Sequence, residues 1–134
     1  DYIDCCGVLH HLDEPQSGFK ALATALAPDG GMGLMVYGAY GRTGIYALQD
    51  ALRQLCRDDD PPEKKVELAI KLIGGLPKTN WFIKNTQLSD HRDSDAGLYD
   101  LLLHSTDRAY KVDALWDEIE AAGLSVASFI EPAK

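Results

Sequence analysis

Apolar residues form two short runs near the start of the chain, and the segment between them has helical spacing. Residues 2–9 and 32–37 are apolar runs of strand length, and the first is typical of a strand buried on both faces. Within residues 15–26, apolar side chains recur at positions i, i+3, i+4 and i+7, which predicts a helix with one apolar face. These positions are Phe19, Leu22, Ala23 and Leu26. A strand, a helix and a strand joined by short connections form a right-handed crossover, so we expect two adjacent parallel strands.

The end of the chain repeats this alternation of helix and strand. Asp113 can cap a helix, and Gly123 lies where a left-handed C-cap residue belongs. The apolar face of this helix consists of Leu115, Ile119 and Ala122. Residues 124–130 then predict a third strand. Together the two ends of the chain indicate an α/β fold, in which helices pack on a sheet.

Residues 39–108 differ in character, because they contain helical patterns and no convincing strand pattern. One amphipathic helix is predicted around Leu48 and Leu52, and a second around Val66 and Ile73. A third, shorter helix is predicted around Leu98, and the polar segment 89–95 is typical of an exposed loop. We therefore expect a helical insertion, or cap, within the α/β domain.

Composition and charge exclude several classes of function. The chain has 134 residues, of which 46% are hydrophobic and 25% charged, as in a globular protein. The net charge of -8 and the scattered lysines argue against nucleic acid as a partner. No apolar run approaches the roughly 18 residues that span a bilayer, and no N-terminal signal pattern is present. The three cysteines, an odd number, indicate reduced thiols in a cytoplasmic protein.

Three segments of the chain resemble one enzyme family. Residues 1–12, which read DYIDCCGVLHHL, resemble the fourth strand and following turn of class I S-adenosyl-L-methionine-dependent methyltransferases. Residues 26–31 (LAPDGG) resemble the turn before the family's fifth strand, and residues 120–124 (EAAGL) the end of the helix before its sixth. The resemblance implies a partial Rossmann-like methyltransferase sheet, made of strands four, five and six. It implies that residues 1–134 are the C-terminal part of a single domain, with further strands before Asp1 and after residue 134.

The candidate cofactor site lies where the first predicted strand ends. In an open α/β sheet, ligands bind outside the carboxyl ends of the strands, and Cys5, Cys6 and Gly7 occupy such an end. Their small side chains would let a ligand approach the backbone closely. The resemblance implies that this backbone meets the methionine portion of S-adenosyl-L-methionine. The alternative is that small residues here only allow tight packing against a helix.

The next residues are the candidates for chemistry on the acceptor. The resemblance places the His10–His11 turn near the transferable methyl group, and an imidazole titrates near neutral pH, so His10 is the candidate for orienting or deprotonating the acceptor. Alternatively, both histidines only cap the turn or pack below it. In-line alignment of acceptor, methyl group and sulfur can supply most of the rate, so methyl transfer does not require a base. We expect no metal site, since adjacent cysteines in a strand point to opposite faces and no second ligand pair follows at zinc spacing.

A loop rich in glycine and tyrosine follows the second predicted strand. Tyr37, Tyr40 and Arg42 are candidates for lining an acceptor pocket, with Arg42 meeting a carboxylate or phosphate. The alternative is that Tyr37 belongs to the core and Arg42 is solvated. Further along, Arg108 is expected to form a structural ion pair.

The sequence thus predicts methyl transfer from S-adenosyl-L-methionine to a small-molecule or protein acceptor. We expect residues 1–134 alone to be inactive, because they contain no glycine-rich loop after a strand and no acid placed to hold a ribose. The alternatives are a catalytically inactive α/β binding module and a nucleotide-dependent oxidoreductase. The acceptor and the oligomeric state stay open.

Overall fold

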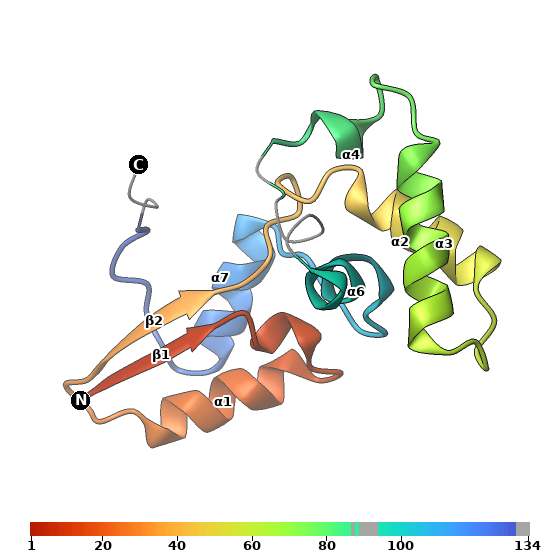
Figure 1. Ribbon diagram of the computed structural model, residues 1–134. Helices are drawn as coiled ribbons and strands as arrows, with labels where there is room; N and C mark the ends of the chain where they lie inside the picture. Colours follow the sequence, from red (N-terminus) through yellow and green to blue (C-terminus); the bar gives the residue numbers. More distant parts are fainter. Residues whose placement is uncertain (87, 89–93, 131–134) are drawn as a thin grey trace. The chain divides into compact units, whose positions relative to one another are not determined.

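A computed structural model describes residues 1–86, 88 and 94–130 of the chain. In this part of the chain the fold is mixed α/β, with six α-helices and a two-stranded parallel sheet (Figure 1). The chain divides into two compact units. The sheet unit comprises residues 1–39 and 106–134, and the helical unit comprises residues 40–105.

The sheet unit is built on a strand–helix–strand crossover. Strand β1 (Tyr2–Cys6) is followed by a short 3-10 helix (Leu9–His11), helix α1 (Pro15–Ala25) and strand β2 (Gly31–Met35). The two strands are parallel, with a register that runs from Tyr2 opposite Gly31 to Cys6 opposite Met35. The predicted parallel pairing is therefore confirmed.

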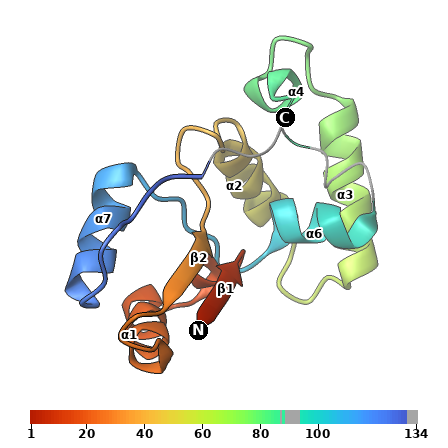
Figure 2. The same cartoon turned by 90° about the vertical axis from the view of Figure 1, so that its left-hand side faces the viewer.

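Within the sheet unit, the described helices cover one face of this strand pair. Helix α1 and helix α7 (Val112–Ala121) lie on the same face (Figure 2). The buried core on this face consists of Cys5, Leu9 and Phe19. On the opposite face, Tyr2 is 67% exposed and Met35 is 44% exposed. The expectation of a first strand buried on both faces is wrong for the described residues, because the alternate residues Tyr2, Asp4 and Cys6 of β1 are exposed.

The C-terminal part of the sheet unit differs from the sequence prediction in two ways. Helix α7 starts after Lys111, so Asp113 lies in its first turn and is not its cap, whereas Gly123 has the predicted left-handed conformation (φ 79°). Residues 124–130, all of which the structure describes, form no strand. They line a groove of about 690 Å³ together with β2 and α7, and this space separates them from the backbone partner that a strand requires.

The helical unit contains helices α2 (Ile45–Leu55), α3 (Pro62–Gly74), α4 (Trp81–Lys84) and α6 (Asp95–Leu103). Helices α2, α3 and α6 coincide with the three predicted amphipathic segments. All four helices contribute to one hydrophobic core. Its buried residues are Ile45, Leu48, Leu52, Val66, Ala69, Phe82, Leu98, Leu101 and Leu102. The buried Gln49 side chain donates a hydrogen bond to the carbonyl oxygen of Leu101 (3.0 Å), which ties α2 to α6.

Helix α4 was not predicted from the sequence, and most of the predicted loop 89–95 falls on residues that the structure does not describe. Helix α4 has only four residues, and its N-cap is Asn80, whose side chain accepts a hydrogen bond from the Phe82 backbone N–H (2.9 Å). The predicted exposed loop 89–95 falls largely on residues 89–93, which lie outside the described residues. Its last part belongs to α6, which is capped by the Ser94 side chain.

Candidate functional site

The carboxyl end of β1 forms a tight glycine turn. Gly7 has a φ of 76°, which an L-residue with a side chain rarely adopts, and its N–H donates to the Met35 carbonyl oxygen (3.1 Å). Among the described atoms outside its two chain neighbours, a methyl group added at Gly7 would have only the Met35 Cε within 4 Å, at 3.7 Å. The backbone at the end of this strand is therefore open to close approach by a ligand.

The two adjacent cysteines have opposite environments. Cys5 is 7% exposed and belongs to the hydrophobic core, whereas Cys6 is exposed and its thiol donates to the Asp4 carboxylate (3.0 Å). Burial raises the pKa of the Cys5 thiol, and the hydrogen bond to Asp4 raises the pKa of the Cys6 thiol. Both thiols are thus held in the protonated form, which is unsuited to nucleophilic chemistry.

The turn after β1 packs its histidines against Tyr37. The His10 side chain is fully buried (0% exposed), and its ring stacks on the Tyr37 ring with 3.7 Å between centroids and an interplanar angle of 28°. The His11 ring lies 4.3 Å from the His10 ring and meets Tyr37 edge-on. His11 Nδ1 lies 2.9 Å from the Thr106 carbonyl oxygen, and since a carbonyl can only accept, this nitrogen carries the proton. The three rings therefore form one rigid cluster.

Residues 106–110 cross the carboxyl ends of both strands, and their backbone is hydrogen-bonded to residues of this cluster. The Arg108 N–H donates to the His10 carbonyl oxygen (3.0 Å), and the Tyr110 N–H donates to the Tyr37 carbonyl oxygen (2.7 Å). The Tyr110 carbonyl oxygen in turn accepts from the Ala39 N–H (2.9 Å). The sequence does not predict these hydrogen bonds, because they join residues about 70 to 100 positions apart and leave no local pattern.

Two side chains of the crossing segment lie close together. The Arg108 guanidinium lies 4.8 Å from the centre of the Tyr110 ring and pairs with the Glu118 carboxylate (3.3 Å), which confirms the predicted structural ion pair. Tyr110 is 4% exposed, and its hydroxyl has no hydrogen-bond partner among the described residues. Burial raises the pKa of this hydroxyl, so Tyr110 stays neutral near pH 7.

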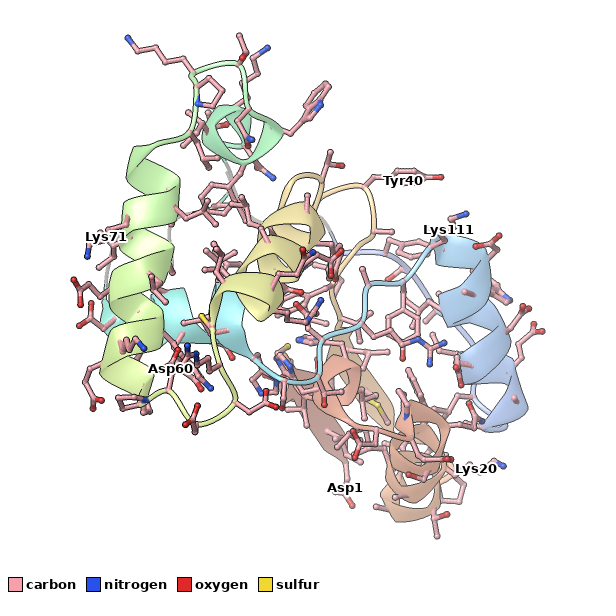
Figure 3. The ribbon with its side chains drawn as sticks, turned by 90° about the vertical axis from the view of Figure 1, so that its right-hand side faces the viewer. Asp1, Lys20, Tyr40, Asp60, Lys71 and Lys111 are labelled. Atoms are coloured by element: carbon pink, nitrogen blue, oxygen red, sulfur yellow. The ribbon has the colours of Figure 1, made fainter. Side chains whose placement is uncertain are left out.

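The helical unit has a pocket of its own, of about 310 Å³. Its walls come from the loop before α2 and from α4, and its lining residues are Tyr40, Gly41, Trp81, Lys84 and Asn85. Tyr40 points outward from its loop (Figure 3) and is 81% exposed, and Trp81 is 68% exposed. The apolar run Trp81–Ile83 was the available sequence signal, but the pattern did not show that Trp81 is exposed while Phe82 is buried.

The three predicted acceptor residues do not share one cluster. Tyr37 belongs to the sheet unit and stacks on His10, whereas Tyr40 and Arg42 belong to the helical unit. Arg42 is only 6% exposed, with its guanidinium 5.6 Å from the centre of the Tyr46 ring, so it is not a solvated side chain. Among the described residues, Arg42 does not line the pocket that contains Tyr40.

The described part of the chain holds no group of three or more histidine, cysteine, aspartate or glutamate side chains placed to bind a metal ion. In the same residues, every helix is too short or too polar to traverse a lipid bilayer.

Comparison with known proteins finds a distant relative of this chain. No model of a known protein family matches the chain. The chain is 31% identical, over an alignment of 134 residues, to an uncharacterised protein of the cyanobacterium Synechococcus sp.. The alignment covers 96% of the chain and 32% of that protein. The chain therefore spans about a third of the length of the curated relative that it matches.

Proposed function

We propose that residues 1–134 form the C-terminal half of an S-adenosyl-L-methionine-dependent methyltransferase domain, with the helical unit as its acceptor-binding cap. The observation that carries this proposal is the parallel pair β1–β2, of which the described helices of the sheet unit cover one face. Parallel sheets occur almost only where helices cover both faces. Exposed Tyr2 and Met35 thus point to a larger Rossmann-like sheet, with covering helices from additional polypeptide.

The groove beside β2 supports a larger sheet as well. Its β2 side presents Met32, Leu34 and Val36, and its far side presents α7 and residues 124–130. An additional strand placed there would pair with the edge of β2 and bury these apolar side chains. The matched cyanobacterial protein, about three times as long as its aligned part, has the length that such a complete domain needs.

The residues at the end of β1 fit the proposed cofactor in part. The open backbone at Gly7, next to the exposed Cys6, suits close approach of the methionine portion of the cofactor. Cys5 does not fit as a side-chain contact, because its thiol lies in the hydrophobic core. When bound, the cofactor supplies a methyl group on a positively charged sulfur. The chain's own contribution is to hold the acceptor in line with that group.

His10 suits an indirect role better than that of a base. Its ring has no exposed surface, so it cannot touch an acceptor while Tyr37 covers it. We therefore assign His10 as a positioning residue, which fixes the Tyr37 ring at the carboxyl end of the sheet. Tyr37 then remains the candidate for contact with the acceptor.

The same burial favours one second candidate, a catalytically inactive α/β binding module. A fully covered His10 cannot act as an exposed imidazole base. The two candidates differ in whether the complete reading frame binds S-adenosyl-L-methionine.

Calorimetric titration and a methyl-transfer assay test the proposal. We expect the product of the complete reading frame to bind S-adenosyl-L-methionine with micromolar affinity. The 134-residue chain should not bind it, since each lost charge-assisted hydrogen bond weakens binding about tenfold or more. In the complete protein, His10→Ala should lower kcat and leave the cofactor Kd unchanged. Micromolar binding by residues 1–134 alone, or no binding by the complete protein, would overturn the proposal.

A further inference from the structure

The pocket of the helical unit combines two aromatic faces with one positive charge. Tyr40 and Trp81 present their rings to solvent at its rim. The Lys84 ammonium lies 5.8 Å from the centre of the Trp81 ring, and Lys84 forms no ion pair with any described residue. Exposed rings offer stacking surfaces, and the ammonium offers a partner for one negative charge.

The backbone that carries these side chains is firmly held. The Asn85 side chain donates to the Gly41 carbonyl oxygen (2.9 Å), which ties the two walls of the pocket together. Phe82, next to Trp81, is 2% exposed in the core of the helical unit. Because the site is built before any ligand arrives, binding does not have to order these loops.

The size and charge of the pocket select one class of ligand. A volume of about 310 Å³ is at the lower end of ligand pockets, which suits a molecule with one or two rings. A single ammonium balances a carboxylate, whereas a phosphate dianion calls for an arginine fork or several donors, and among the residues that the structure describes no arginine lines the pocket. We propose that this pocket binds a small aromatic carboxylate, with its ring against Trp81 and Tyr40 and its carboxylate at Lys84.

This inference deepens the proposed function, and it rests on that function only for the statement that the ligand is the methyl acceptor. Binding itself needs neither S-adenosyl-L-methionine nor the sheet unit's chemistry. The pocket can therefore be tested in the 134-residue chain without cofactor.

The test is a titration of the 134-residue chain with 4-fluorobenzoate, followed by fluorine NMR. The neutral 4-fluorobenzamide tests the charge, and displacement by cyclohexanecarboxylate tests the aromatic face. Lys84→Met should weaken 4-fluorobenzoate binding about three- to tenfold, which is the range for an exposed to a partly shielded charge contact. Trp81→Leu should weaken it about tenfold through lost stacking and apolar contact.

Matched variants outside the pocket are the controls. Lys78→Met removes another exposed lysine, and Trp116→Phe changes the other tryptophan, which lies in the sheet unit. Both should leave the Kd within twofold of the unmodified chain. Equal affinity for the amide, effective competition by cyclohexanecarboxylate, or unchanged binding in Trp81→Leu would overturn the pocket. If the 134-residue chain binds the probe but the complete protein transfers no methyl group, the proposed function is overturned and the proposed pocket is not.

Discussion

Replacing Gly44 by alanine should destabilise the helical unit and disturb its pocket. Gly44 precedes α2 with a φ of 92°, in the left-handed region. A methyl group there would lie 2.5 Å from the Phe82 backbone nitrogen and 2.9 Å from the Trp81 carbonyl carbon. These are backbone atoms, so the clash cannot be relieved by rotating a side chain. The substitution must push α4 away from the loop before α2.

The two costs of this substitution can be estimated separately. An alanine held in the left-handed region costs about 1–3 kcal/mol. Forcing extra volume into a packed contact typically costs about 1–3 kcal/mol more. Some relaxation of α4 reduces the second cost, so we expect Gly44→Ala to lower the free energy of unfolding by about 2–5 kcal/mol.

Urea unfolding followed by far-UV circular dichroism measures this loss. The control is Gly74→Ala at the last residue of α3, where no described atom outside the local helix backbone and the chain neighbours lies within 4 Å of the added methyl group. It should be neutral or stabilise the helix by up to about 1 kcal/mol. If Gly44→Ala costs less than about 1 kcal/mol, the close approach of α4 to Gly44 is not a feature of the folded protein.

Three further predictions follow from single features of the structure. Tyr110→Phe removes a buried hydroxyl that has no hydrogen-bond partner among the described residues, so it should leave Tm unchanged or raise it; a clear loss of Tm would show that the hydroxyl is bonded. The hydrogen bond from Lys64 lowers the pKa of Asp60, so its contribution to stability is present above the ordinary aspartate pKa and is lost as the pH falls through the lowered one. In acid titrations of Tm, Asp60→Asn should therefore have a shallower slope than the unmodified chain, and an identical slope would contradict this. The exposed face with Tyr2 and Met35 should make the 134-residue chain self-associate, and a monomer at all concentrations in size-exclusion chromatography would count against it.

The elements that the sequence predicted well are those with a regular internal period. Helices α2 and α3 show an apolar residue every three or four positions over more than ten residues. This period is visible in the local sequence, without knowledge of the tertiary contacts. The parallel pairing of β1 and β2 follows from the length and handedness of the crossover. Helix α4 escaped prediction, because four residues are too few to show a period and its N-cap, Asn80, is an ordinary loop residue.

The errors arise where a feature depends on partners distant in sequence. Residues 124–130 have the composition of a strand, but a strand exists only where a neighbouring strand pairs with it. His10 is typical of an exposed catalytic turn, yet Tyr37 and the crossing segment 106–110 cover it. Arg42 was predicted to reach a ligand or solvent, and instead it is buried in the helical unit. In each case the local sequence shows which side chains are present, and contacts with residues distant in sequence decide whether they pair, are buried or are exposed.

The two units differ in how far they bury their own apolar surface, and this difference bears on the proposed division of labour. All four helices of the helical unit contribute to its shared core, so its pocket rests on a self-sufficient scaffold. The sheet unit has a small buried core of Cys5, Leu9 and Phe19, and it leaves one sheet face exposed. A scaffold with its own core can hold Trp81 and Lys84 in place whether or not the sheet is completed by further polypeptide. Under the proposed function, acceptor recognition and cofactor binding are thus stabilised separately, and substitutions in the helical unit can change the acceptor without weakening the cofactor site.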